Sequence, residues 1–234
     1  NGISLELYGK GYVLGPDAGI GKYLYSGLDY IEYYSQMPAH NTVVVDGVSS
    51  YPVMMSQHAF KLIASYPEVS KEQPASKKLS EQKERMTYAT VSFIEPETQA
   101  LQQRTTAIVK TSDKGGYYID VFRSKKQEGG DKTHDYFYHN LGQQMQVVDA
   151  ATGKPLDMKP TEELAFAGGH LYAYSYIYNK ESSEMQGSIK TQFVTRIEDD
   201  KVVEAMDGQR EITMTMWMKA DTDRTIFKAL SPVN

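Results

Sequence analysis

The sequence predicts an all-β fold, a large antiparallel β-sandwich of more than ten strands. The first observation is the period of two in its apolar residues, as where Ile3, Leu5 and Leu7 alternate with polar residues. The second is the spacing of short apolar runs by connectors rich in Gly and Asp, which is typical of hairpins and loops. The third is the count of 18 tyrosines in 234 residues, a residue type that suits half-buried sheet surfaces.

The expected strands cover most of the chain. Residues 3–14 predict two short strands with a turn at 9–11, and the buried run at 41–45 predicts a strand that ends in an Asp-Gly turn. The later expected strands are 89–95, 103–111, 116–124, 133–140, 144–149, 170–179, 189–198, 201–206, 210–219 and 224–230. We expect residues 1–234 to form a single β-sandwich domain without a long helix.

Residues 68–85 interrupt this pattern. They are dense in Lys, Glu and Ser and contain Pro74, which predicts an exposed polar excursion with one short helix around 78–85. A mobile lip over a substrate cleft is one interpretation, and a solvated loop is the simpler one.

Composition narrows the function classes. The chain has no cysteine, which excludes disulfides and thiolate metal sites. A formal net charge of −5 argues against broad binding to nucleic acid or anionic membranes, and an anionic glycan would need local positive groups. No apolar run approaches the roughly 18 residues of a membrane-spanning helix.

Asp17 and His40 are the candidate metal ligands. Asp17 lies between an apolar strand and a glycine-rich turn, and His40 directly precedes the strand at 41–45. A carboxylate and an imidazole at strand ends can bind zinc if further ligands complete the site. Each residue also has a structural explanation, since Asp after Gly-Pro forms turns and a histidine can simply be hydrogen-bonded in the fold.

The same stretch resembles a known family. An apolar strand, Asp-x-Gly, a tyrosine-rich stretch and "AHNTVVVDG" occur in that order, and they are followed by "GYYIDVFRSKKQEGGDKTHDYFYHNLG" and "TMTMWMKADTDRTIFKALSP". These segments resemble the heparinase II/III-like polysaccharide lyases over nearly the whole chain. The resemblance implies the C-terminal β-sheet region of a protein whose N-terminal part is an (α/α) toroid, with the active site between the two.

The resemblance also implies site residues. A divalent metal ion, zinc in many relatives, would be held by Asp17 and His40, and the third ligand would be a histidine upstream of Asn1. The chain would therefore be a fragment, inactive alone, that packs on the toroid of the same protein. Many relatives have a basic residue just before the His-Asn-Thr motif, where this chain has residues 35–38 (SQMP), and this departure puts the sugar preference in question.

The implied reaction is β-elimination from a uronic-acid-containing polysaccharide. A base removes the C5 proton beside a neutralised carboxylate, and an acid protonates the leaving oxygen. In some relatives a tyrosine between the two metal ligands takes part, and here Tyr25 is the first candidate and Tyr30 the second, among the tyrosines at 23, 25, 30, 33 and 34. Cleft lining is the alternative role for all five.

Other patterns have structural explanations. His134 and His139 would point to opposite faces of one strand, which makes a shared ion unfavourable, and we expect Asp120 and Arg123 to make polar contacts near them. The alternating tyrosines of 170–179 predict either a packed sheet face or a ladder of rings for sugars. Trp217, between methionines, is expected in the core.

The sequence thus predicts the β-domain of a periplasmic or secreted polysaccharide lyase with an anionic polysaccharide as its partner. The alternative is a non-catalytic carbohydrate-binding or structural β-domain. A free-standing metal enzyme, whose third ligand would come from another histidine of the chain, is a weaker alternative.

Overall fold

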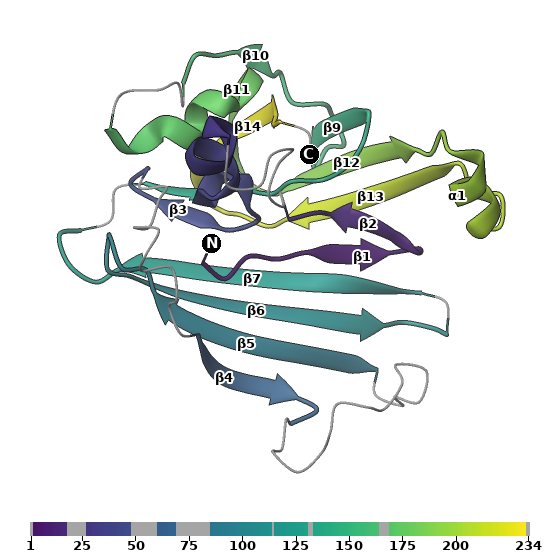
Figure 1. Ribbon diagram of the computed structural model, residues 1–234, viewed down its shortest axis with the longest axis horizontal. Helices are drawn as coiled ribbons and strands as arrows, with labels where there is room; N and C mark the ends of the chain where they lie inside the picture. Colours follow the sequence, from purple (N-terminus) through teal and green to yellow (C-terminus); the bar gives the residue numbers. More distant parts are fainter. Residues whose placement is uncertain are drawn as a thin grey trace. The chain divides into compact units, whose positions relative to one another are not determined.

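Strands dominate the computed structural model, as the sequence predicts for an all-β chain (Figure 1). The structure describes residues 2–17, 27–47, 60–68, 85–113, 115–130, 133–163 and 169–232. The chain divides into two compact units. Unit 1 contains residues 1–3 and 43–135, and unit 2 contains residues 4–42 and 136–234.

Unit 1 is built on one four-stranded antiparallel sheet in which sequence neighbours pair (Figure 1). Its strands are β4 (Lys61–Tyr66), β5 (Met86–Ile94), β6 (Ala100–Lys110) and β7 (Gly116–Lys126). A second pair joins β3 (Val43–Val45) to β8 (His134–Tyr136). The predicted Asp-Gly turn after β3 is confirmed, because Asp46 and Gly47 both have positive φ, as a tight turn requires.

A buried ion pair organises one face of the unit 1 sheet. The Arg104 side chain is 2% exposed and donates from Nε and Nη2 to both carboxylate oxygens of Asp120, at 2.8 and 2.7 Å. Its Nη1 donates to the carbonyl of Ile3 at 2.8 Å. The expected polar contact of Asp120 is thus made with Arg104, whereas Arg123, three residues further along the same strand, points to the opposite face.

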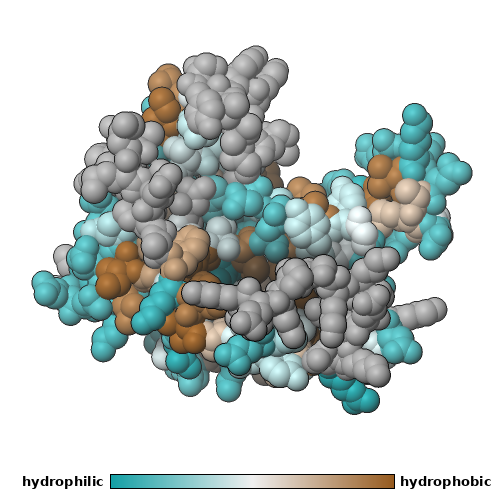
Figure 2. Space-filling view, turned by 60° about the horizontal axis from the view of Figure 1, so that its bottom comes forward, coloured by the Kyte–Doolittle hydropathy of each residue, from teal (hydrophilic) through white to brown (hydrophobic). Residues whose placement is uncertain are grey.

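The opposite face of this sheet is rich in exposed apolar side chains. Cross-strand register places residues 94, 101 and 125 together on it, and also 86, 109 and 117. Figure 2 shows hydrophobic patches between hydrophilic ones on the side of the molecule that it presents. Exposed apolar residues on this face include Met86, Ile94, Leu101, Tyr117, Ile119 and Val121.

Unit 2 contains three antiparallel sheets. The hairpin β1 (Leu7–Gly9) and β2 (Tyr12–Gly15) turns at Lys10 and Gly11, which both have positive φ, and this confirms the predicted turn. The second sheet has the order β13-β12-β9 and the third the order β10-β11-β14. Their bounds are β9 (Gln144–Asp149), β10 (Lys159–Pro160), β11 (Tyr178–Gln186), β12 (Ile189–Arg196), β13 (Glu211–Met218) and β14 (Asp223–Leu230).

Two of these sheets form a sandwich within unit 2. Val147 of β9 and Ile189 of β12 pack with Ile226 of β14 in one buried cluster, which methionines of β9, β11 and β13 extend. A second cluster places Leu7 and Leu14 of the β1–β2 hairpin against Ile212 of β13. Burial of these aliphatic side chains supplies the main stabilisation of the layers.

Short helices replace two predicted strands. Residues 201–206 were expected to extend, yet α1 (Asp200–Ala205) forms there because the Asp199 carboxylate accepts a hydrogen bond from the Lys201 amide and Val203 is buried in the second cluster. Residues 170–176 were expected in a strand, yet η5 (Gly169–Tyr176) is a 3₁₀ helix, and β11 begins only at Tyr178. Both interpretations of the tyrosines of 170–179, a packed sheet face and a ladder of rings for sugars, need one strand there and are therefore wrong.

Two further sequence predictions concern the surface. Trp217 is 66% exposed, so its expected core position is wrong. Most of the predicted polar excursion, residues 69–84, lies outside the described residues. Within the described part of the chain, no helix is long and apolar enough to cross a bilayer.

Candidate functional site

His40 is held in unit 2 by a short helix that precedes it. The 3₁₀ helix η2 (Met37–Ala39) begins with Pro38 in its first turn, where the missing amide proton of proline costs no hydrogen bond. The His40 amide closes the helix by donating to the carbonyl of Met37 at 3.0 Å. The His40 side chain is 1% exposed, which fixes its ring within the packed interior.

The structure brings Asp17 and His40 into direct contact. His40 Nδ1 lies 2.5 Å from Asp17 Oδ1, and Ser4 Oγ donates to Asp17 Oδ2 at 3.2 Å. The sequence hypothesis required the two side chains within about 5 Å of each other, as ligands of one ion. The Asp17 side chain is 34% exposed, so this edge of the pair faces solvent.

The hydrogen bond of His40 Nε2 determines what can lie between His40 Nδ1 and Asp17. Nε2 lies 3.1 Å from the carbonyl oxygen of Tyr34, which can only accept, so Nε2 carries a proton. Nδ1 and the facing carboxylate oxygen would then both be acceptors. The contact requires either a proton between Nδ1 and Asp17 Oδ1 or a cation bound by both.

The Tyr34 carbonyl comes from an unusual helix. The helix η1 (Tyr30–Tyr34) is a π-helix, in which the Ser35 amide donates to the Tyr30 carbonyl at 2.9 Å. Asp29 caps its start, because a carboxylate oxygen accepts from the Tyr30 amide at 3.0 Å. Helices with this wider turn occur often at functional sites.

Asn41, the residue after His40, joins three backbone segments by hydrogen bonds. Its Nδ2 donates to the carbonyls of Leu5 at 2.8 Å and Pro16 at 3.1 Å, and its Oδ1 accepts from the amide of His139 at 2.5 Å. Asn41 is fully buried. Because Pro16 precedes Asp17, Asn41 fixes the backbone that carries the candidate metal ligand. The sequence analysis did not predict this role. The available signal was a polar residue, Asn41, at the start of the strand expected at 41–45.

His139 lies near the Asp17–His40 pair but makes its own contacts outside it. Its Nε2 donates to the carbonyl of Pro38 at 2.8 Å, and its ring stacks on Phe137. Burial lowers the pKa of His139, and the nearby His40 lowers it further. His139 is therefore a neutral, structural histidine beside the pair, whereas His134 lies in unit 1 and contacts Ser124 at 3.0 Å.

The tyrosines between the two ligands have different positions. Tyr25, the first candidate for catalysis, lies outside the described residues, as does Tyr23. Tyr30 is half-buried on η1 and packs against the hydrophobic cluster that contains the buried Tyr33 and Tyr34. Burial raises the pKa of Tyr33 to about 12, so Tyr33 is a poor base near neutral pH.

The pair supplies two donors of the kinds that zinc accepts. Zinc–ligand distances near 2.1 Å would place the two donor atoms roughly 3.4 Å apart, so the contact would open by about 1 Å around an ion. Among the described residues, no group of three or more His, Asp, Glu or Cys side chains could hold a metal. The residues thus fit part of a metal site.

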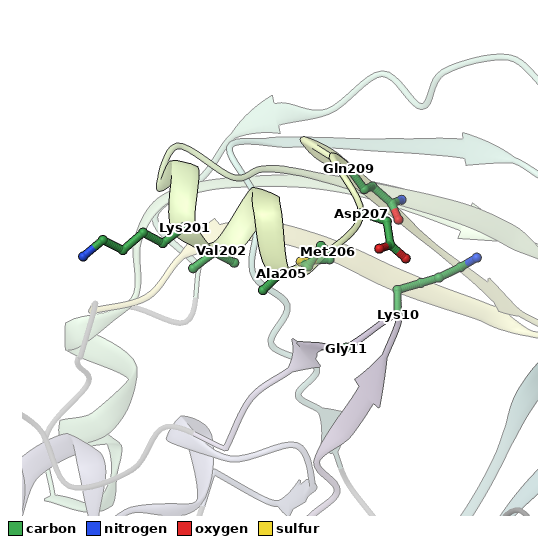
Figure 3. A pocket seen from close by; sticks show the side chains of 8 residues that line it. All are labelled: Lys10, Gly11, Lys201, Val202, Ala205, Met206, Asp207 and Gln209. Atoms are coloured by element: carbon green, nitrogen blue, oxygen red, sulfur yellow. The ribbon is translucent and has the colours of Figure 1, made fainter.

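A surface cavity lies elsewhere in unit 2. It has a volume of about 530 Å³ and is lined by the β1–β2 turn and by α1 with the turn after it (Figure 3). None of the residues predicted for catalysis or metal binding lines it. Its lining residues are Lys10, Gly11, Lys201, Val202, Ala205, Met206, Asp207 and Gln209.

Comparison with known proteins gives one informative similarity. Over 170 residues the chain is 32% identical to the endo-acting ulvan lyase of Formosa agariphila. This part of the chain is similar to a polysaccharide lyase. The aligned stretch covers 68% of this chain and 20% of that lyase, so the chain spans a minor part of the relative's length. No known family model matches the chain.

Proposed function

We propose that the chain is the β-sandwich part of a polysaccharide lyase of the heparinase II/III-like type, which cleaves a uronic-acid-containing glycan by β-elimination. The similarity to an ulvan lyase supports lyase chemistry on a polysaccharide. The observation that carries the site is the contact of His40 Nδ1 with Asp17 Oδ1 at 2.5 Å, with Nε2 bound to a carbonyl.

The residues of the chain have distinct tasks in this proposal. The Tyr34 carbonyl keeps the proton on His40 Nε2, which leaves Nδ1 and the Asp17 carboxylate to face a cation. Zinc, when bound there, would supply positive charge that orients the acidic sugar or nearby side chains. The C5 proton would pass to the phenolate of a tyrosine of the segment between the two ligands, Tyr25 or Tyr30, and an acid would protonate the leaving O4 oxygen.

The remaining groups would come from outside these 234 residues. We propose that the third metal ligand is a histidine upstream of Asn1, and that the positive groups that neutralise the sugar carboxylate lie on an N-terminal helical toroid of the same protein. Support comes from the two-donor site of the described residues and from the small share of the relative that the chain spans. The chain alone would then be inactive, and the protein would act in the periplasm or outside the cell.

An elimination assay tests the proposal. Elimination leaves an unsaturated uronate, which absorbs ultraviolet light, whereas hydrolysis leaves none. The longer protein should generate this absorbance from ulvan, the substrate that the relative's name states, and Asp17→Asn should reduce the rate. Heparan sulfate, chondroitin, hyaluronan and alginate would show the range of substrates. New reducing ends without absorbance would overturn the reaction type.

A non-catalytic carbohydrate-binding domain is the second candidate. One observation favours it, namely the 66% exposure of Trp217 on β13 of unit 2. Glycan binding without elimination on any of these substrates would support this candidate instead.

A further inference from the structure

The outer face of the β13-β12-β9 sheet carries the only tryptophan of the chain. Along β12 buried and less buried residues alternate strictly, with Ile189, Thr191 and Phe193 facing inward. Trp217 of β13 pairs with Lys190 of β12, so both lie on the other face. A side chain of this size is usually covered, yet Trp217 is 66% exposed.

The neighbours of Trp217 form an ordered polar surface. Lys190 Nζ lies 5.6 Å from the centre of the Trp217 ring, a cation–π contact that restrains the ring. In the next row of the register, Gln192 lies between Thr215 of β13 and Gln146 of β9, which are both exposed. Besides Trp217, these two rows contain one ammonium, two amides and one hydroxyl, and their sixth member, Val148, is buried.

This combination matches the chemistry of an acidic polysaccharide. A pyranose ring has an apolar C–H face that can stack on an indole and hydroxyls that exchange hydrogen bonds with amides. An ammonium complements a sugar carboxylate or sulfate, and these rows offer no carboxylate to repel it.

We infer that Trp217, Lys190, Gln192, Thr215 and Gln146 form a glycan-binding surface, separate in sequence and function from the Asp17–His40 site. The acidic nature of its ligand rests on the proposed function. The surface holds the polymer and carries out no chemistry.

The dimensions of the face favour a single sugar chain. Three strands spaced by about 4.8 Å give a strip roughly 10 Å wide. A stable protein partner needs about 800 Å² of surface on each side, which this strip does not provide by itself. A second copy of the chain is therefore the less suitable occupant.

The test uses Trp217 as its own reporter. Because the chain has one tryptophan, its indole fluorescence comes from Trp217 alone, and titration with ulvan should change it saturably. In native gels containing ulvan, the chain should be retarded, and Trp217→Ala should weaken the apparent affinity about tenfold. Lys190→Ala should weaken it less, and its effect should vanish in high salt. Tyr117→Ala, which removes an exposed ring in unit 1, is the matched control and should bind as the wild type does.

The outcomes separate this inference from the proposed function. Equal retardation of the wild type and Trp217→Ala would overturn the surface, even if elimination is observed. Retardation that depends on Trp217, without elimination in the longer protein, would support the surface and contradict the lyase. A dimer that forms without glycan and is lost in Trp217→Ala would assign the face to a second copy and overturn the inference. Circular dichroism of each variant checks that the sheet is intact.

Discussion

His40 Nδ1 lies 2.5 Å from Asp17 Oδ1, while the Tyr34 carbonyl occupies the other ring nitrogen at 3.1 Å. The two residues are 23 positions apart, and the contact joins the end of the β1–β2 hairpin to the residue after η2. This arrangement leaves one proton or one cation as the partner that both groups share, and the two cases can be separated by metal binding.

The first prediction is metal binding that depends on both residues. Asp17→Asn and His40→Ala should each lower zinc affinity by at least about tenfold, because each removes or neutralises a donor. Equilibrium dialysis followed by elemental analysis measures it without any activity assay. His134→Ala, an exposed histidine of unit 1, is the control and should bind zinc as the wild type does. Unchanged zinc content in both site variants would show that the pair shares a proton instead.

The second prediction concerns Asn41. Asn41→Ala removes three hydrogen bonds and leaves two carbonyls and one amide without this partner. The free energy of unfolding should fall by about 3 kcal/mol. Urea unfolding measures this change, and Gln144→Ala, an exposed amide on β9, should change it by less than about 0.5 kcal/mol. Equal effects of both substitutions would show that Asn41 does not hold the three segments together.

The third prediction compares two ion pairs of different burial. Asp120→Ala leaves the Arg104 guanidinium, 2% exposed, without its carboxylate and should cost about 3 kcal/mol or more of unfolding free energy. Asp157→Ala breaks the exposed Lys159–Asp157 pair, whose side chains are 76% and 85% exposed, and should cost less than about 0.5 kcal/mol. Denaturant titration of both variants measures the two losses of unfolding free energy. Similar losses would contradict the claim that the buried Arg104 depends on its ion pair with Asp120.

The fourth prediction is loss of stability in alkali. Burial, with the hydrogen-bonded Glu32 as the next cause, raises the pKa of Tyr176 to about 12 from 10.0, and burial raises that of Tyr33 to about 12. The folded state therefore favours the neutral phenols over the phenolates. Their contribution to the free energy of unfolding is complete below pH 10 and is lost as the pH rises toward 12.

Thermal unfolding across this range provides the measurement. The melting temperature should fall between pH 10 and 12, and Tyr176→Phe should make the fall smaller. Tyr117→Phe, at an exposed position, should follow the wild-type curve. A wild-type melting temperature that stays constant over this range would contradict the burial of the two phenols.

The strand pattern was predictable where the period of two is strict. β6, β7 and β12 lie where the alternation predicts them, and the turns at Gly11 and Asp46 follow from residues that tolerate positive φ. The contact of Asp17 with His40 was also predictable, from the resemblance rather than from periodicity. The metal and catalytic roles of the site residues stay predictions.

The failures have different physical causes. Over 170–176 both Ala173 and its neighbour Tyr174 are almost fully buried, so tertiary packing on all sides overrides the strand preference of tyrosine. Over 201–206, Val203 and Met206 share a helical spacing that a short apolar run does not distinguish from a strand. At Trp217 a signal was present, since the alternating methionines at 214, 216 and 218 face inward and leave position 217 outside.

Asn41 also determines when the site can form. Its partners lie 36, 25 and 98 residues away in the sequence, so the loop-closure entropy of three long separations must be met before Asp17 and His40 come together. Contacts between residues so far apart in the sequence are the kind that slows folding among small proteins. An ion that needs both side chains would bind the native chain and not the unfolded one, so it would raise the free energy of unfolding and make it depend on the metal concentration.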